Sequence, residues 1–136
     1  MRHLLDTNCW IAFFKRRNSP LGIRIENTLP AEIATCSIVR AELLHGAEKY
    51  ENVERRADLV RRTLSLYASL PFDDAAADHF ARIRHCLQVK GMAIGPYDLQ
   101  IAAVCLAHDL TIVTNNVREF SRVDGLRVED WTVAAT

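Results

Sequence analysis

Acidic residues stand at four places where a strand would end or a helix would begin, and these are the side chains best placed for chemistry. Asp6 follows a short apolar stretch at the start of the chain, and Asp98 lies in the first turn of an expected helix. Glu42 lies in the second turn of another helix, and the polar segment 115–119 follows the most β-branched stretch. Carboxylates that converge repel one another unless a hard cation lies among them, and oxygen ligands suit Mg²⁺ or Mn²⁺. Such a site can activate water and stabilise charge on a phosphoryl group.

Each of these acids also has a simpler explanation. Asp6 can cap the helix that follows it, and Glu42 can face solvent. Asp98 can interact with the macrodipole of its helix, which favours an anion there by about 0.3–1 kcal/mol. Convergence of several acids is therefore what distinguishes a metal site from ordinary helix chemistry.

The sequence offers no competing nucleophile or nucleotide-binding motif. The patterns Gly-x-Ser-x-Gly and Gly-x-Gly-x-x-Gly and the phosphate-binding loop are absent, and the five histidines show no His-x-x-x-His spacing. The four cysteines are far apart, each in an apolar run, so we expect buried free thiols and no zinc site: Cys9, Cys36, Cys86 and Cys105. A haloacid-dehalogenase-like phosphatase would need a second aspartate where Asn8 stands.

Strand-like and helix-like segments alternate along the chain. Strands are predicted over residues 1–5, 32–36, 70–72, 110–114 and 126–129, and helices over 9–14, 20–27, 37–47, 48–65, 75–90 and 96–108. Thr7 or Asn8 is expected to cap the first helix, and Ser37 the third. The alternation predicts an α/β fold, a three-layer α/β/α sandwich with a mostly parallel sheet of about five short strands. We expect a single domain over residues 1–136.

The composition is that of a soluble globular protein. The 136 residues are 49% hydrophobic and 25% charged, with a formal net charge of zero, so net charge does not attract nucleic acid to the whole molecule. The sequence shows no basic-then-apolar leader and no apolar run long enough to cross a membrane, so we expect a cytoplasmic protein.

Five short motifs, in order along nearly the whole chain, resemble those of PIN-domain ribonucleases, and the last resembles the end of VapC-type toxins of bacterial toxin–antitoxin pairs. The motifs are Leu4-Leu5-Asp6-Thr7-Asn8, Ser37-x-x-x-x-Glu42-Leu43-x-x-Gly46, Gly95-Pro96-Tyr97-Asp98-x-x-Ile101-Ala102, Val113-Thr114-Asn115-Asn116-x-Arg118-Glu119-Phe120 and Gly125-Leu126-Arg127-Val128-Glu129-Asp130-Trp131.

The resemblance implies a Mg²⁺- or Mn²⁺-dependent endoribonuclease. By position, Asp6, Glu42 and Asp98 match the three core acids of the family, with Asp6 and Asp98 as metal ligands. Many members carry a fourth acid directly after the last long strand, where this chain has Asn115-Asn116. Glu119 is then the expected fourth acid.

The resemblance also implies supporting groups and an outcome for the reaction. Thr7, Asn8 and Ser37 would orient the acids through hydrogen bonds, and Asn116 would be a polar support. Water would be the nucleophile, giving 5′-phosphate and 3′-hydroxyl ends.

The resemblance implies two partners, an RNA substrate and a cognate antitoxin protein. The implied substrate is initiator tRNA, cut in its anticodon loop. The toxin would form a homodimer and a higher assembly with the antitoxin, whose tail would reach the acidic site through a groove between helices 20–29 and 53–70. The alternative is a catalytically weak PIN-like module that binds RNA or a partner, which the departure at 115–116 favours.

Overall fold

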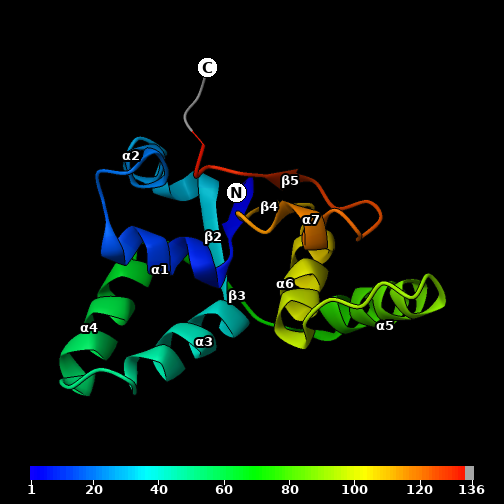
Figure 1. The fold of residues 1–136 in the computed structure, drawn as a ribbon, viewed down its shortest axis with the longest axis horizontal. Helices are drawn as coiled ribbons and strands as arrows, with labels where there is room; N and C mark the ends of the chain where they lie inside the picture. The colour runs from blue at the N-terminus through cyan, green and yellow to red at the C-terminus, as the bar shows by residue number, and fades with distance from the viewer. Residues whose placement is uncertain (134–136) are drawn as a thin grey trace.

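A parallel five-stranded sheet forms the centre of the computed structural model, which describes residues 1–133 (Figure 1). The strands are β1 His3–Leu5, β2 Ile33–Cys36, β3 Ala68–Leu70, β4 Thr111–Val113 and β5 Val128–Glu129. Their order in the sheet is β3-β2-β1-β4-β5, and each neighbouring pair is parallel. Leu4 lies opposite Ala34 on one side and Ile112 on the other, so β1 is the central strand.

Helices cover both faces of this sheet. They are α1 Thr7–Lys15, α2 Pro20–Glu26, α3 Ser37–Ala47, α4 Val53–Leu64, α5 Asp74–Val89, α6 Pro96–Ala107 and α7 Val117–Phe120, with a short 3₁₀ helix at Pro30–Glu32. The chain moves from β1 to β2 to β3 towards one edge, then returns through β4 to β5. Because crossovers are right-handed, α1 to α4 lie on one face and α5 to α7 on the other, as Figure 1 shows. The predicted three-layer α/β/α architecture is confirmed.

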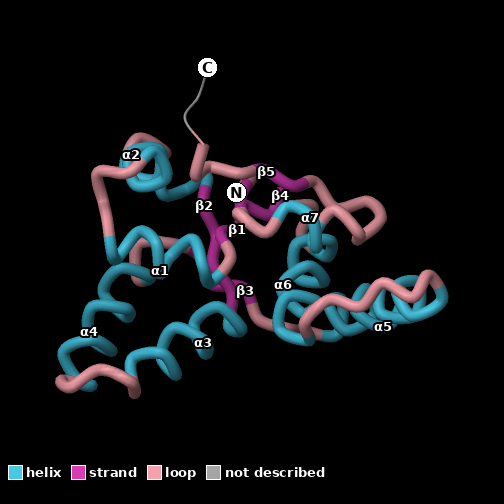
Figure 2. The backbone as a smooth tube through the Cα atoms, viewed as in Figure 1, coloured by secondary structure: helices cyan, strands magenta, loops and turns pink. Residues whose placement is uncertain are grey.

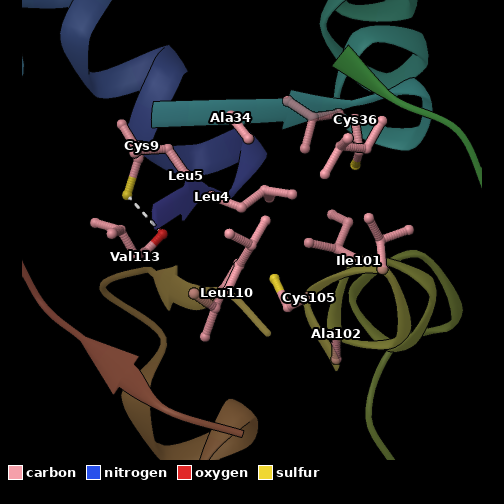
Figure 3. Packing of buried hydrophobic residues seen from close by; sticks show 14 of the residues in the cluster. Leu4, Leu5, Cys9, Ala34, Cys36, Ile101, Ala102, Cys105, Leu110 and Val113 are labelled. Carbon is pink, nitrogen blue, oxygen red and sulfur yellow. Dashed lines mark hydrogen bonds between the residues drawn. The ribbon is translucent and has the colours of Figure 1, made fainter. Parts of the chain in front are cut away.

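The core extends over both faces of the sheet, and the part that positions Asp98 lies between the central strands and α6. Leu4 and Ala34 from the strands pack near Ile101 and Cys105 of α6, and all four are fully buried (Figure 3). A helix buried on nearly every side needs the all-round apolar composition that α6 has. The element that carries Asp98 is therefore anchored in the core. Over residues 1–133, no helix has the length and apolar character needed to span a membrane.

Two predicted elements were wrong in their bounds. The third strand ends at Leu70 instead of beginning there, because Pro71 has no N–H to donate and cannot continue the pairing. The helix predicted over 48–65 begins only at Val53, after the turn visible between α3 and α4 in Figure 2. Asn52 is the N-cap of α4, because its side chain accepts a hydrogen bond from the Arg55 N–H at 3.0 Å.

The predicted caps were also wrong. The first helix begins at Thr7 with Asp6 as its N-cap, so neither Thr7 nor Asn8 caps it. Ser37 is the first residue inside α3, and its hydroxyl donates instead to the carbonyl of Leu70 at 3.2 Å. That hydrogen bond ties α3 to the end of β3.

The cysteine prediction was confirmed for three residues out of four. Cys9, Cys36 and Cys105 are buried free thiols, but Cys86 is free and exposed. Helix α5 buries Ile83 and Leu87, and Cys86 lies outside that buried face. An apolar neighbourhood in the sequence did not distinguish the two sides of this helix.

Candidate active site

The carboxyl ends of β1 and β4 are neighbours at the point where the order of strands reverses: β2 and β3 follow β1 on one side, and β4 and β5 lie on the other. Ligands bind at such switch points in open α/β sheets, just outside the strand ends. Asp6 directly follows β1 and Thr114 directly follows β4. The Thr114 hydroxyl donates to Asp6 Oδ2 at 2.5 Å, and the Asp6 N–H donates to the carbonyl of Val113 at 3.0 Å. The register of the two strands therefore fixes the position of the Asp6 carboxylate.

Asp6 is at once a helix cap and a buried acid. Its Oδ1 accepts a hydrogen bond from the Cys9 N–H at 2.9 Å, and only 3% of the residue is exposed. Burial raises the pKa of Asp6 above its usual value, and the hydrogen bonds from Thr114 and Cys9 oppose that rise. The simpler explanation of Asp6 as a cap is thus correct, but it leaves a carboxylate in the crevice as well.

Asp98 lies in the first turn of α6, close enough to the other three acids to be affected by their charges. Its pKa is raised from the usual 3.8 to about 6. Burial contributes most, and the negative charges of Asp6, Glu42 and Glu119 add to it. The charges of three acids from separate parts of the sequence therefore reach Asp98 near the end of the sheet. This is the convergence that single positions in the sequence were unable to show.

Uncharged side chains hold two of these acids. The Thr7 hydroxyl donates to Glu42 Oε1 at 2.7 Å, which links α1 to α3. The Asn116 side-chain amide donates to Glu119 Oε2 at 2.8 Å. The Asn116 backbone N–H donates to the Thr114 hydroxyl oxygen at 2.9 Å. Asn116 thus connects Glu119 to the hydroxyl that contacts Asp6.

The other two predicted supporting residues lie outside this hydrogen-bonded set. Asn8 is exposed on α1, and it lines the same hollow as Thr7 and Glu42. Ser37 donates to Leu70 and joins α3 to β3. The structure therefore brings Thr7 and Asn116 to the acids.

In the part of the chain that the structure describes, no basic side chain forms an ion pair with the four acids, Asp6, Glu42, Asp98 and Glu119. Within residues 1–133, no three acidic, histidine or cysteine side chains lie close enough to form a ready metal cluster. An all-oxygen set of mutually repelling, unneutralised carboxylates fits a hard divalent cation, which would draw the side chains closer together.

Three residues near the acids were not predicted from the sequence as part of the site. Thr114 is a hydroxyl directly after the strand that neighbours β1, and its partner was identifiable only once the strand order was known. Asp130 follows β5, and its charge also raises the pKa of Asp6. Cys9 donates its thiol hydrogen to the carbonyl of Val113 at 3.4 Å (Figure 3), and burial and the Asp6 charge raise its pKa. Cys9 is therefore a neutral thiol and not a nucleophile.

Comparisons with known proteins identify relatives of similar length. Residues 3–126 match the PIN domain family. The tRNA(fMet)-specific endonuclease VapC of Shigella flexneri is 39% identical over 133 residues, which cover 97% of this chain and 99% of that protein. A crystal structure of DNA-bound VapBC from Salmonella typhimurium matches with a TM-score of 0.90 and 37% identity, covering 96% of this chain and 98% of that one. VapBC2 from Rickettsia felis, bound to a DNA fragment from its promoter, matches with a TM-score of 0.88 and 31% identity, covering 96% and 99%.

Proposed function

The chain belongs to the PIN domain family, and we propose that it is the metal-dependent endoribonuclease toxin of a bacterial toxin–antitoxin pair, built as a single domain. One observation carries this proposal. Burial and the charges of three other carboxylates, Asp6, Glu42 and Glu119, raise the pKa of Asp98, and no ion pair within residues 1–133 involves any of the four acids. Relatives named ribonuclease or endonuclease share almost the full length of the chain.

The acids would hold Mg²⁺ or Mn²⁺. We assign Asp6 and Asp98 as direct ligands, with Glu42 and Glu119 completing the negative site. When bound, the cation would make water a better nucleophile and stabilise the charge that grows on the phosphoryl group. Nearby uncharged donors keep the acids oriented: Thr114 holds Asp6, and Thr7 holds Glu42.

Glu119 replaces the acid that many family members carry directly after the last long strand. Its carboxylate contributes to the raised pKa of Asp98, and Asn116 fixes it through a 2.8 Å hydrogen bond. Asn116 therefore serves as a positioning residue for Glu119. Because a divalent cation at these acids would activate water in place of the neighbouring 2′-hydroxyl, the products are expected to carry 5′-phosphate and 3′-hydroxyl ends.

The substrate and partners follow from the relatives. Two relatives are named tRNA(fMet)-specific endonucleases, so we propose initiator tRNA as the substrate of this chain. Structures of relatives are VapBC complexes, which supports a cognate antitoxin as partner, and we propose a cytoplasmic homodimer that assembles with it. A hollow lined by Phe13, Ile25, Leu59 and Tyr67 opens between α2 and α4, where we place part of the antitoxin tail.

Cleavage of a purified tRNA pool tests this function. The antitoxin-free wild-type protein should make one discrete cut with Mg²⁺ or Mn²⁺, should make none in excess EDTA, and should recover when Mn²⁺ is restored. Ligation-based mapping should find 5′-phosphate ends at the cut. A cut that persists in EDTA would contradict the metal mechanism. A folded protein that makes no cut with either ion would instead favour the RNA- or partner-binding module.

A further inference from the structure

A groove between α1 and α3 opens directly beside the acid site. The two helices are in contact and lie side by side in Figure 1. One hollow of the groove, about 450 Å³ in volume, has Thr7 and Glu42 of the acid site in its wall, together with Tyr97. A second hollow, of about 460 Å³, also borders Glu42 and continues the groove towards α4. Both volumes lie within the roughly 300–1,000 Å³ of typical ligand pockets. We call these two joined hollows the α1–α3 groove.

The groove carries the charge that a phosphate backbone needs. Lys15, Lys49 and Arg56 line it, and Glu42 is its one acidic lining residue. None of the ion pairs formed within residues 1–133 uses either lysine, so both charges are free for a ligand. An anionic strand that approaches four carboxylates needs such cations beside them.

Aromatic side chains are interleaved with these cations. Tyr97 is 57% exposed and Tyr50 is 46% exposed, so both rings are accessible to a ligand. The Arg56 guanidinium lies 4.3 Å from the Tyr50 ring centroid and 4.9 Å from that of Phe14. Exposed rings beside cations are the surface on which single-stranded bases stack. This combination favours RNA over a purely apolar peptide segment.

Gly46 lines both hollows. It lies in the last turn of α3, where glycine costs about 0.5–1 kcal/mol relative to alanine. A Cβ built on Gly46 would meet nothing within 4 Å, and its backbone does not adopt the left-handed conformation that favours glycine. Internal packing therefore does not account for this glycine. Its missing side chain leaves the groove open where the two hollows join.

We propose that the RNA strand leaving the acid site runs through the α1–α3 groove over Gly46. Lys49 binds a backbone phosphate there, and Tyr97 or Tyr50 stacks on a base. This inference rests on the proposed ribonuclease function and deepens it, because it names the path of the substrate and the residues that hold it outside the acid site.

Binding of RNA to a cleavage-silent protein tests the path. The parent is the full chain with Asp98→Asn, and the probe is a fluorescein-labelled RNA hairpin with the initiator anticodon loop, followed by fluorescence anisotropy over a range of KCl concentrations. Adding Lys49→Gln should raise Kd about 3–10-fold at low salt and reduce the slope of log K against log salt by about 0.7–1. Lys90→Gln is the matched control, because Lys90 pairs with Asp124 and is the C-cap residue of α5, outside the α1–α3 groove.

Gly46→Met separates a steric role from a structural one. The methionine should fill the groove and raise the Kd for RNA about tenfold with the salt slope unchanged. The thermal midpoint should stay the same or rise, because methionine is the better helix former.

If the parent binds RNA and both variants match it in Kd and salt slope, the proposed RNA path is wrong and the proposed function still holds. Unchanged RNA binding by Gly46→Met, with loss of co-purification with the cognate antitoxin, would assign the groove to a peptide and overturn the path. A parent that binds no RNA, together with a wild type that cuts no tRNA, would overturn both proposals.

Discussion

Asp98→Asn is expected to abolish RNA cleavage and, at the same time, to stabilise the metal-free protein. The site is proposed to stabilise the charge on the phosphoryl group in the transition state by several kcal/mol. The loss of this acid should therefore lower kcat by about 10³ or more. The gain in stability has a separate cause. Burial, and then the charges of three neighbouring acids, disfavour the charged form of Asp98 in the folded protein, and an uncharged amide avoids that penalty.

The pH dependence of this stability gain follows from the direction of the shift. The pKa of Asp98 is about 6 in the folded protein against the usual 3.8, so the folded state binds the proton more tightly. The wild type should therefore lose stability as pH rises from about 4 to about 6, and the gain from Asp98→Asn should be absent at pH 4 and complete above pH 6. We expect Asp98→Asn to raise the free energy of unfolding by about 1–2 kcal/mol above pH 6. This is less than the roughly 3 kcal/mol that corresponds to a pKa change of about two units, because solvent screens a partly exposed acid.

Urea unfolding in EDTA at pH 4 and pH 7.5 measures this gain. Asp74→Asn is the matched control, because Asp74 lies in the first turn of α5 as Asp98 does in α6, but it is exposed and is not among the charges that shift Asp98. It should lose up to about 1 kcal/mol of helix-dipole stabilisation and keep full activity. An Asp98→Asn protein that is less stable than the wild type at pH 7.5 would show that the acids do not repel one another there.

Two substitutions of Asp6 should separate its role as a cap from its role as an acid. Asn is as good an N-cap as Asp, so Asp6→Asn should keep the hydrogen bond from the Cys9 N–H and stay within about 1 kcal/mol of wild-type stability. Asp6→Ala loses that acceptor and leaves the Thr114 hydroxyl without its partner, so it should be about 1–3 kcal/mol less stable. Both should lower cleavage by about 10³ or more, because both remove the charge.

Unfolding in urea and a cleavage time course on the same two proteins provide the comparison. If Asp6→Asn cuts RNA at the wild-type rate, Asp6 is only a helix cap. If Asp6→Ala is as stable as Asp6→Asn, the cap contributes nothing and the acid alone explains the position.

The layered architecture was predictable because strands and helices alternate with distinct patterns. The apolar stretch that ends at Leu5 and the β-branched stretch that ends at Val113 became neighbouring central strands. Strand bounds near Pro71 were less predictable, because the residues before it pair with β2 although Ala68 and Ser69 are exposed and carry no apolar pattern. The apolar pattern of a sequence indicates which residues are buried. An edge strand such as β3 is buried only in part, so its bounds are harder to predict.

The acids of the site were identifiable as candidates, but their arrangement was not. Sequence placed Asp6 after a strand and Asp98 at a helix start, and each position allowed an ordinary capping role. Strand order brings Thr114 to Asp6 across 108 residues of sequence, and no local pattern encodes that contact. For the same reason, the sequence did not show that Gly46, inside α3, lines two hollows beside the acids.

Mn²⁺ binding by the RNA-free protein tests most directly whether the four acids form one metal site. Electron paramagnetic resonance of free Mn²⁺ at pH 7.5 measures it for the wild type, Asp98→Asn and the control Asp74→Asn. We predict that the wild type and Asp74→Asn bind Mn²⁺ alike and that Asp98→Asn binds at least tenfold more weakly, a loss of about 1.4 kcal/mol or more. Equal binding by the wild type and Asp98→Asn, or no binding by the wild type, would contradict the assignment of these acids as a metal site.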